Sequence, residues 1–354
     1  MTDKYKIVFI GPISPPVTGP GVKNKELIDS FKRHGIELIE INSLGWIKKI
    51  FNFFFIVIKN SIKYKHVVLS ISKKGRFTLI PLMYILNILF DVKYMLLPAG
   101  GNLDKEINKA LPIYKLLFIK SLKKSSKIYV ESKSLRDGLK NLKINNVEYM
   151  PNPRRNLNFK WKYNQSKEKH IIFLSKIKPE KGVVLLIEAA KILISTNKHL
   201  KFLFYGPIDP LFEDKFYLLI KETTFIHYQG ISKPDQVQEI LSKADLFILP
   251  TMWKNEGLPG VLVEASFSGV PMIISRFRAS EEFIENEING IIIEPGSVDE
   301  IVNSISRLLN SENLLNKLSN NFKKLSAEFD VDIHIKKIIS DMHKYDWKIN
   351  DEKS

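Results

Sequence analysis

Short apolar segments alternate with stretches of helical periodicity along the whole chain. Most of the apolar segments are continuous hydrophobic runs, which is typical of strands buried on both faces of a sheet. Twelve of them predict strands, at residues 6–11, 36–42, 66–72, 92–100, 127–132, 147–152, 170–176, 200–206, 225–230, 245–251, 271–275 and 290–295. Helical periodicity occupies the intervals, as at Val183–Ile194. Repeated βα units predict parallel sheets with helices on both faces.

The segment Pro151–Lys169 interrupts this alternation. It is polar and basic and contains two prolines, as expected of a linker. A chain of 354 residues has room for two domains. The pattern therefore predicts two doubly wound α/β domains, over residues 1–158 and 159–332.

Composition narrows the class of protein. Hydrophobic residues make up 44% and charged residues 26%, as in globular proteins, and the chain has no cysteine. Disulfide scaffolds, thiolate zinc sites, iron–sulfur clusters and cysteine nucleophiles are thereby excluded. The longest apolar runs, Ile50–Ile58 and Leu79–Phe90, are shorter than the ~20 residues of a membrane-spanning helix. The first residues are too polar for a signal peptide, so a cytoplasmic protein is expected.

The positive charge is concentrated in one half of the chain. Residues 1–162 hold 30 Lys and Arg against 11 Asp and Glu, a net of +19, whereas residues 163–354 carry a net of −3. This asymmetry indicates an anionic partner, either nucleic acid or a membrane. Two stretches, 46–66 and 112–127, mix lysines with aromatic and aliphatic residues, as interfacial helices do. Core helices with solvated lysines are the alternative. The chain has no nucleic-acid-binding motif, and its charge is mostly lysine, which favours an anionic membrane surface.

The stretch Asn255–Ile274 carries the most informative chemistry. A strand ends, a Glu-Gly-Leu-Pro-Gly turn follows, and a helix is expected near Pro259, whose first amides and dipole would bind an anion. Glu256 and Glu264 would then lie on the order of 10 Å apart. This spacing suits a ligand with a hydroxyl-rich group at each end and a diphosphate between them, such as a nucleotide sugar. An ordinary βα turn with a capping carboxylate is the other interpretation.

The two glutamates, with seven residues between them, resemble the motif of the family 4 retaining glycosyltransferases, which have the GT-B fold. Segments 173–189, 205–209, 228–251 and 280–301 are also similar to that family and occur in its order. The resemblance implies two Rossmann-like domains facing across a cleft. It also implies that the last helix, from about residue 333 to 354, returns to the first domain, which binds the acceptor and the membrane.

The resemblance assigns roles to residues of the second domain. Glu256 would contact the sugar hydroxyls of the donor, and Glu264 would accept hydrogen bonds from its ribose. Lys176 and Lys181 would neutralise the departing diphosphate, although the family usually has arginine at the first of these positions. The remaining donor-binding residues implied in this way are Gly257, Leu258, Pro259, Gly206 and Glu282.

Two loops of the first domain complete the expected site. Gly19 and Gly21 follow the first strand, and their lack of a side chain permits close approach of a ligand. Gly100, Gly101 and Asn102 form the second loop. Many relatives place a histidine that touches the donor sugar before these glycines, but this chain has Ala99 there.

The sequence thus predicts a metal-independent, retaining transfer of a sugar from a nucleotide-sugar donor, such as a UDP-sugar, to a glycan or lipid-linked glycan in surface polysaccharide synthesis. No cofactor or metal is expected: Asp330 and Asp332 are interpreted as a helix cap, and the scattered histidines lack zinc-site spacing. The enzyme would act at the inner face of the membrane. A nucleotide-sugar epimerase or hydrolase and a nucleic-acid-binding protein are the alternatives.

Overall fold

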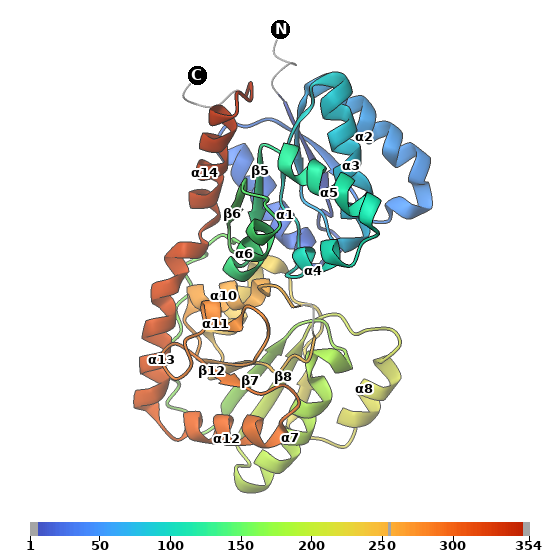
Figure 1. Ribbon diagram of the computed structural model, residues 1–354. Coiled ribbons are helices and arrows are strands. Elements are labelled where there is room, and N and C mark those ends of the chain that lie inside the picture. Colours follow the sequence, from blue (N-terminus) through green and yellow to red (C-terminus); the bar gives the residue numbers. More distant parts are fainter. Residues whose placement is uncertain (1–5, 254–255, 350–354) are drawn as a thin grey trace. The chain divides into compact units, whose positions relative to one another are not determined.

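The computed structural model describes residues 6–253 and 256–349, apart from the side chains of residues 46, 48 and 74. The chain forms two compact units (Figure 1). Unit 1 combines the residues up to Arg155 with those from Phe329 onward, and unit 2 runs from Asn156 to Glu328. Each unit contains one six-stranded sheet, and every predicted strand is present, with bounds that differ by up to four residues at either end. The strand and sheet predictions are therefore confirmed.

The sheet of unit 1 is parallel throughout and has the order β2-β1-β3-β4-β5-β6. Its strands are β1 (Ile7–Gly11), β2 (Leu38–Asn42), β3 (His66–Leu69), β4 (Lys93–Leu96), β5 (Lys127–Val130) and β6 (Val147–Tyr149). Its helices are α1 (Gly19–Arg33), α2 (Ile50–Tyr64), α3 (Lys73–Phe90), α4 (Leu103–Asn108), α5 (Pro112–Lys124), α6 (Lys133–Asn141) and α14 (Val331–Lys344), and a 3-10 turn, η2 (Trp46–Lys49), precedes α2.

Alternation along the strands divides the core of unit 1 into two layers. Val8 and Ile10 of β1 face one hydrophobic cluster, which α2, α3, α5 and α6 cover. Ile7 and Phe9 face the other cluster, which α1 and α14 cover. Because successive side chains of a strand point to opposite faces, a continuous apolar run fills both layers. The carboxy-terminal helix therefore supplies part of the core of unit 1.

Asp330 caps this returning helix. Its carboxylate accepts a hydrogen bond from the backbone N–H of Asp332 at 2.8 Å, while the Asp332 carboxylate accepts from Ser30 and Arg33 of α1. Both aspartates thus have roles at a helix start and in helix packing. In the part of the chain that the structure describes, no three His, Asp or Glu side chains are grouped as a metal site requires.

Unit 2 has the same architecture as unit 1. Its sheet has the strand order β12-β11-β10-β7-β8-β9 and is again parallel throughout. Its strands are β7 (Lys169–Leu174), β8 (Leu200–Tyr205), β9 (Ile226–Tyr228), β10 (Leu246–Leu249), β11 (Met272–Ser275) and β12 (Ile291–Ile293). Its helices are α7 (Val183–Thr196), α8 (Glu213–Ile220), α9 (Val237–Ser242), α10 (Gly260–Ser268), α11 (Ser280–Phe283), α12 (Val298–Leu309) and α13 (Glu312–Leu325). Three 3-10 turns, η3 (Pro179–Lys181), η4 (Pro234–Gln236) and η5 (Ser326–Phe329), complete the regular structure.

Candidate active site

The topology of unit 2 indicates the edge of its sheet at which a ligand would bind. From β7 the chain proceeds through β8 and β9 in one direction, and from β10 through β11 and β12 in the other. Strands β7 and β10 are neighbours, so the strand order reverses between them. Ligands of doubly wound folds bind beyond the carboxyl ends of the strands at such a reversal. The two loops there are residues 175–182 and 250–259.

The two loops bring opposite charges together. Lys181 of the first loop forms an ion pair with Glu256 of the second, and both side chains are largely buried. The hydroxyl of Thr251 donates a second hydrogen bond to the same carboxylate at 3.2 Å. An ammonium has three N–H donors, so Lys181 can hold Glu256 and still donate to a ligand. The structure therefore brings two of the predicted residues into direct contact.

Backbone contacts fix the distance between these loops. The N–H of Met252 donates to the carbonyl of Glu180 at 2.8 Å. Gly182 has a φ of +79°, and a Cβ there would lie 1.9 Å from the carbonyl oxygen of Pro250. Only glycine permits this approach without rearrangement. The glycine that follows Lys181 thus serves the packing of the two loops.

Lys176 is held by the loop after β8. Its ammonium donates to Asp209 at 2.6 Å, and the backbone N–H of Leu211 donates to the other carboxylate oxygen. These two donors hold the pKa of Asp209 below its ordinary value. Gly206, at the end of β8, adopts a φ of +128°, and a Cβ there would meet the carbonyl oxygen of Ser175 at 2.0 Å. Gly206 therefore brings the β8 loop up to the lysine loop.

The predicted helix follows the second loop. Helix α10 begins at Gly260, with Pro259 as its N-cap residue. Glu264 lies on this helix and is buried, and Leu258 is buried just before it. Gly257 lies between Glu256 and Leu258, and Glu282 lies in the short helix α11, at the end of the loop that follows β11. Asn255, at the start of the predicted motif, lies outside the described residues.

The glycine loops of unit 1 occupy the corresponding edge of the other sheet. Gly19 opens α1, and a Cβ at this position would meet no other atom. Gly21 differs, because a Cβ there would lie 2.7 Å from the hydroxyl of Thr18, which caps the helix. The missing side chain of Gly21 is thus used within the loop itself.

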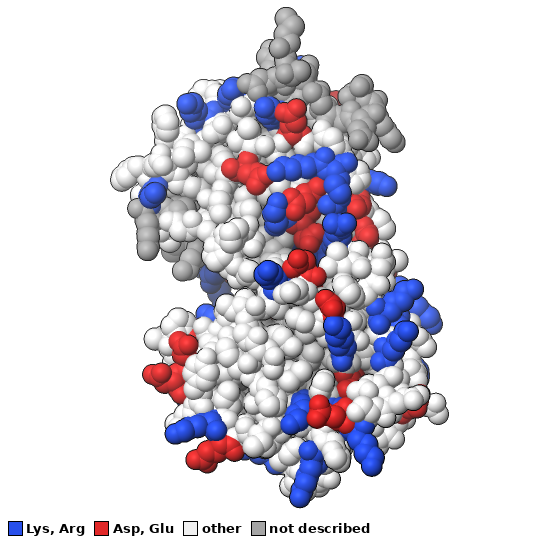
Figure 2. Space-filling model, turned by 180° about the vertical axis from the view of Figure 1, so that it is seen from behind, with Lys and Arg blue, Asp and Glu red and all other residues white. Residues whose placement is uncertain are grey.

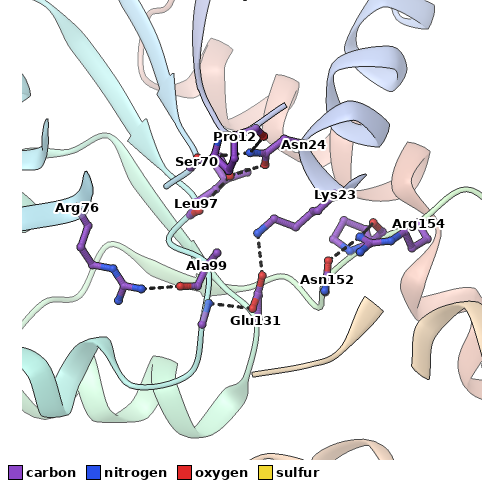
Figure 3. Close-up of polar contacts among 12 residues, drawn as sticks. Pro12, Lys23, Asn24, Ser70, Arg76, Leu97, Ala99, Glu131, Asn152 and Arg154 are labelled. Carbon is purple, nitrogen blue, oxygen red and sulfur yellow. Dashed lines mark hydrogen bonds and ion pairs between the residues drawn. The ribbon is translucent and has the colours of Figure 1, made fainter. Parts of the chain in front are cut away.

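A buried polar cluster anchors the Gly100 loop (Figure 3). Glu131, which follows β5, accepts from the ammonium of Lys23 at 2.8 Å and from the backbone N–H of Gly100 at 3.2 Å. Arg76 donates to the carbonyl of Ala99 at 2.6 Å and pairs with Glu106. Gly101 and Asn102 continue from this loop into α4, for which Asn102 is the N-cap residue. Glu131 and Arg76 therefore fix the loop, and Lys23 of α1 holds Glu131 in place.

Nearby, Asn24 forms hydrogen bonds at the point where the strand order of unit 1 reverses. Its amide donates to the carbonyl of Pro12 at 2.8 Å, and its side-chain oxygen accepts from the hydroxyl of Ser70 at 2.6 Å. These contacts join the loops that follow β1 and β3 (Figure 3). The polar groups at this reversal are paired with one another.

Sequence reasoning missed several of these residues. Asp209 and Thr251 follow strands that flank β7, which is a signal for a position at the same edge of the sheet. Lys178 stands two residues after Lys176, and its ammonium lies over the ring of Trp253. Glu131 and Lys23 are far apart in the sequence, and no local pattern announces their ion pair.

Known proteins provide an independent comparison. Residues 155–325 match the family model described as glycosyl transferases group 1. The chain is 27% identical over 153 residues to the UDP-Gal:alpha-D-GlcNAc-diphosphoundecaprenol alpha-1,3-galactosyltransferase of Escherichia coli, covering 41% of this chain and 39% of that protein. It is 31% identical over 150 residues to the lipopolysaccharide 1,2-N-acetylglucosaminetransferase of Salmonella typhimurium, covering 39% of each. The chain thus spans about two fifths of the length of these relatives.

Solved structures match over nearly the whole chain. The Anabaena protein HepE, crystallised in complex with UDP, aligns with a TM-score of 0.73 at 14% identity, over 96% of this chain and all of that one. Similarity at this level of identity shows the fold. The chain has the GT-B fold, with its two Rossmann-like units, and the part that matches the glycosyl transferases group 1 model, residues 155–325, makes up nearly all of unit 2.

Proposed function

We infer that the protein transfers a glycosyl group from a nucleotide sugar to a glycan or lipid-linked glycan acceptor, with retention of configuration and without a metal ion. The observation that supports this most directly is the meeting of Lys181 and Glu256 across the strand reversal of a glycosyl transferases group 1 domain. The E. coli and Salmonella relatives are named for sugar transfer to a lipid-linked sugar and to lipopolysaccharide. We therefore propose a role in surface polysaccharide synthesis.

In this proposal, Lys176 and Lys181 receive the diphosphate of the donor. The bond between the sugar C1 and the diphosphate oxygen breaks, and a bond forms from the acceptor hydroxyl oxygen to C1 on the same face. The acceptor proton passes to the departing diphosphate, whose increasing negative charge the two ammonium groups stabilise. Glu256, kept in place by Lys181 and Thr251, would accept hydrogen bonds from the sugar hydroxyls. Glu264 would bind the ribose.

UDP is the nucleotide we propose for the donor. The name of the E. coli relative contains UDP-Gal, and the Anabaena structure contains UDP. A thermal-shift comparison of UDP, GDP and ADP sugars tests this choice, since a ligand that binds the native state raises the melting temperature. The largest shift is expected from a UDP sugar.

Product analysis tests the reaction itself. The protein is incubated with the preferred donor and a polyprenyl-diphosphate sugar, with and without excess EDTA, and the anomeric configuration of the new linkage is read by NMR. Transfer with retention that persists in EDTA is expected. Release of free sugar or conversion of the donor without any acceptor would instead identify a hydrolase or an epimerase. Activity that EDTA abolishes and a divalent metal restores would contradict the metal-free mechanism.

We also propose that unit 1 binds an anionic membrane through the outer face of α2, α3 and α5. These helices lie side by side over one face of the sheet (Figure 1). Each exposes large apolar side chains, among them Phe51 (90% exposed), Phe55 (64%) and Ile113 (83%). The exposed apolar residues of this layer are Ile50, Phe51, Phe55, Ile56, Ile85, Ile88, Leu89, Phe90, Ile113 and Leu116.

Charge supports a lipid surface as the partner. Helices α2, α3 and α5 contain several lysines and no Asp or Glu. Exposed lysines 59, 63, 120 and 123 accompany the apolar side chains. On the face that Figure 2 shows, the side of unit 1 that carries α2 is mostly white, with separate Lys or Arg side chains at its edge. Apolar side chains bordered by lysines favour insertion at the boundary of an anionic bilayer.

No helix among the described residues is long and apolar enough to cross a bilayer. Peripheral binding at the inner face of the membrane is therefore the mode we propose, and it would place the enzyme beside a lipid-linked acceptor.

A further inference from the structure

Lys178 is a third cation at the strand reversal of unit 2. It lies between Lys176 and Lys181 in the loop after β7, and its ammonium is 3.7 Å from the centroid of the Trp253 indole. Trp253 belongs to the loop after β10. A cation this close to the face of an indole is attracted by the negative charge of the ring face. The two side chains therefore link the same two loops as the ion pair of Lys181 and Glu256.

The three lysines differ in how their charge is balanced. Lys176 pairs with Asp209, and Lys181 pairs with Glu256. Within the described part of the chain, no carboxylate lies within ion-pair distance of Lys178, and its interaction partner is an uncharged ring. An indole attracts an ammonium but does not cancel its charge. Among the described residues, Lys178 thus contributes positive charge that no ion-paired carboxylate offsets.

The surroundings of Lys178 oppose its charge. Desolvation lowers the pKa of its ammonium, and the like charges of Lys181 and Lys176 lower it further, against the opposing effects of Glu180 and Glu256. The side chain is half-buried, unlike that of a lysine on a solvated face. A bound anion would relieve both effects, because it supplies the missing countercharge and replaces lost hydration.

The backbone of Trp253 is fixed by hydrogen bonds. Its backbone N–H donates to the hydroxyl of Thr251 at 3.1 Å, and its carbonyl accepts from the N–H of Glu256 at 3.1 Å. Met252, next to it, is bonded to the carbonyl of Glu180 in the opposite loop. The indole projects from this fixed backbone and contacts the Lys178 ammonium at the reversal.

We propose that Lys178, positioned by Trp253, is a specificity-determining cation that binds the diphosphate group of the ligand. This inference rests on the proposed function for the identity of the donor, but its chemistry requires only a diphosphate. With Lys176 and Lys181 each sharing a carboxylate, the additional charge favours a diphosphate over a single phosphate. Trp253 acts as a positioning residue, because its aromatic face holds the ammonium of Lys178.

Calorimetric titration with inorganic pyrophosphate, UDP, UMP and uridine tests the proposal. Lys178→Ala should weaken pyrophosphate and UDP binding about tenfold, the effect of one hydrogen bond to a charged group. UMP should be affected less and uridine not at all. The dependence of UDP affinity on salt should also become less steep. Lys215→Ala, at an exposed position of α8, is the matched control and should bind all four ligands as the parent does.

Trp253 provides the second arm of the experiment. Trp253→Ala should lose much of the affinity for pyrophosphate and UDP. Trp253→Phe should retain most of that affinity, because phenylalanine keeps an aromatic face. The effects of Lys178→Ala and Trp253→Ala should not add in the double variant. Additive effects, or equal losses for uridine and UDP, would overturn the positioning role.

The outcomes also separate this inference from the proposed function. Binding of pyrophosphate that depends on Lys178, in a protein that transfers no sugar, would retain the inference and reject the enzyme. Sugar transfer with unchanged diphosphate affinity in Lys178→Ala would reject the inference alone. Failure of the parent protein to bind both pyrophosphate and UDP would reject both.

Discussion

The pairing of Lys181 with Glu256 links the catalytic role proposed for Lys181 to local stability. Both side chains are largely buried, so removing the cation leaves a carboxylate whose remaining hydrogen bond, as far as the described residues show, comes from Thr251. Breaking a buried pair from one side costs more than replacing both members, because one charge remains uncompensated. Lys181 therefore stabilises the folded protein in addition to its role in the proposed reaction.

Substitutions at this pair can separate the two roles. Lys181→Met should lower both the melting temperature and kcat, with a loss of stability of about 1–3 kcal/mol. The double variant Lys181→Met/Glu256→Gln should recover much of the stability but none of the turnover. Chemical unfolding and initial-rate kinetics on the three proteins measure the two quantities. Recovery of kcat in the double variant would mean that neither charge takes part in the reaction.

Glu264 provides a test of nucleotide binding. Glu264→Gln keeps the shape of the side chain on α10 but removes the charge that a ribose hydroxyl would meet. Donor affinity should fall by about 1–3 kcal/mol, the range for hydrogen bonds to charged groups. Free UDP should lose the same amount, because the ribose is common to both ligands. Equal affinities of parent and variant for UDP would refute the ribose assignment.

Residues on one continuous motif were predictable from the sequence, and partners across the fold were not. Glu256, Pro259 and Glu264 lie within one βα unit, where the end of a strand and a helix start are visible locally. The contact of Lys181 with Glu256 joins residues 75 positions apart, and that of Lys23 with Glu131 joins residues 108 positions apart. Such pairs depend on the strand order, which local patterns do not specify.

At the scale of elements, the strands were the easiest to predict. Their apolar runs are buried on both faces, so the strength of the signal reflects the two-layered core of each sheet. The ends of the helices were less certain. The stretch 46–66, for example, forms the 3-10 turn η2 followed by α2, and the two are divided at Lys49, whose φ of −133° and ψ of 43° lie outside helical geometry.

A histidine connects the carboxy-terminal segment to the sheet of unit 1. His66, the first residue of β3, is buried against Trp347. Its Nε2 accepts from the backbone N–H of Lys348 at 3.1 Å, so its Nδ1 carries the proton and donates to the carbonyl of Tyr64. Burial lowers the pKa of this imidazole. Protonation would remove the acceptor that Lys348 uses.

Stability should therefore depend on pH through His66. Because the folded-state pKa lies below the unfolded value of ~6.5, the folded protein binds fewer protons in that interval. The stabilisation is fully present above the unfolded pKa and is lost as the pH falls through the folded pKa. The unfolding free energy of the parent should approach that of His66→Gln as the pH falls from 8 to 5. His199→Gln, at an exposed position, is the control. A constant difference between the parent and His66→Gln would contradict the prediction.

At the scale of the whole molecule, the outer face of α2, α3 and α5 predicts membrane binding with two components. The lysines should provide attraction of up to ~1 kcal/mol each, which weakens as the Debye length shrinks from ~10 Å at 0.1 M to ~3 Å at 1 M salt. Inserted aromatic side chains should leave a salt-resistant remainder. The protein should therefore sediment with anionic liposomes and not with neutral ones.

Matched variants separate the two components. Changing lysines 59, 63, 120 and 123 to Gln should abolish the salt-sensitive part, whereas the same change at lysines 215, 221 and 317 of unit 2 should have little effect. The double variant Phe51→Ser/Phe55→Ser should abolish the salt-resistant part of liposome binding. Leu211→Ser is the control, because Leu211 of unit 2 is 99% exposed. Tighter binding to duplex DNA than to anionic vesicles at equal ionic strength would identify nucleic acid as the partner of the basic half.

The return of α14 to unit 1 has a consequence for the order of synthesis. Unit 2 is one continuous segment, inserted between the two parts of unit 1. Val331, Ile335, Ile338 and Met342 complete a core that the first 155 residues begin. A ribosome that adds ~5–20 residues per second needs on the order of 10–30 s to make the intervening segment. Throughout that interval, the nascent first half exposes the groove that α14 later fills, so chaperones have their longest opportunity to bind there.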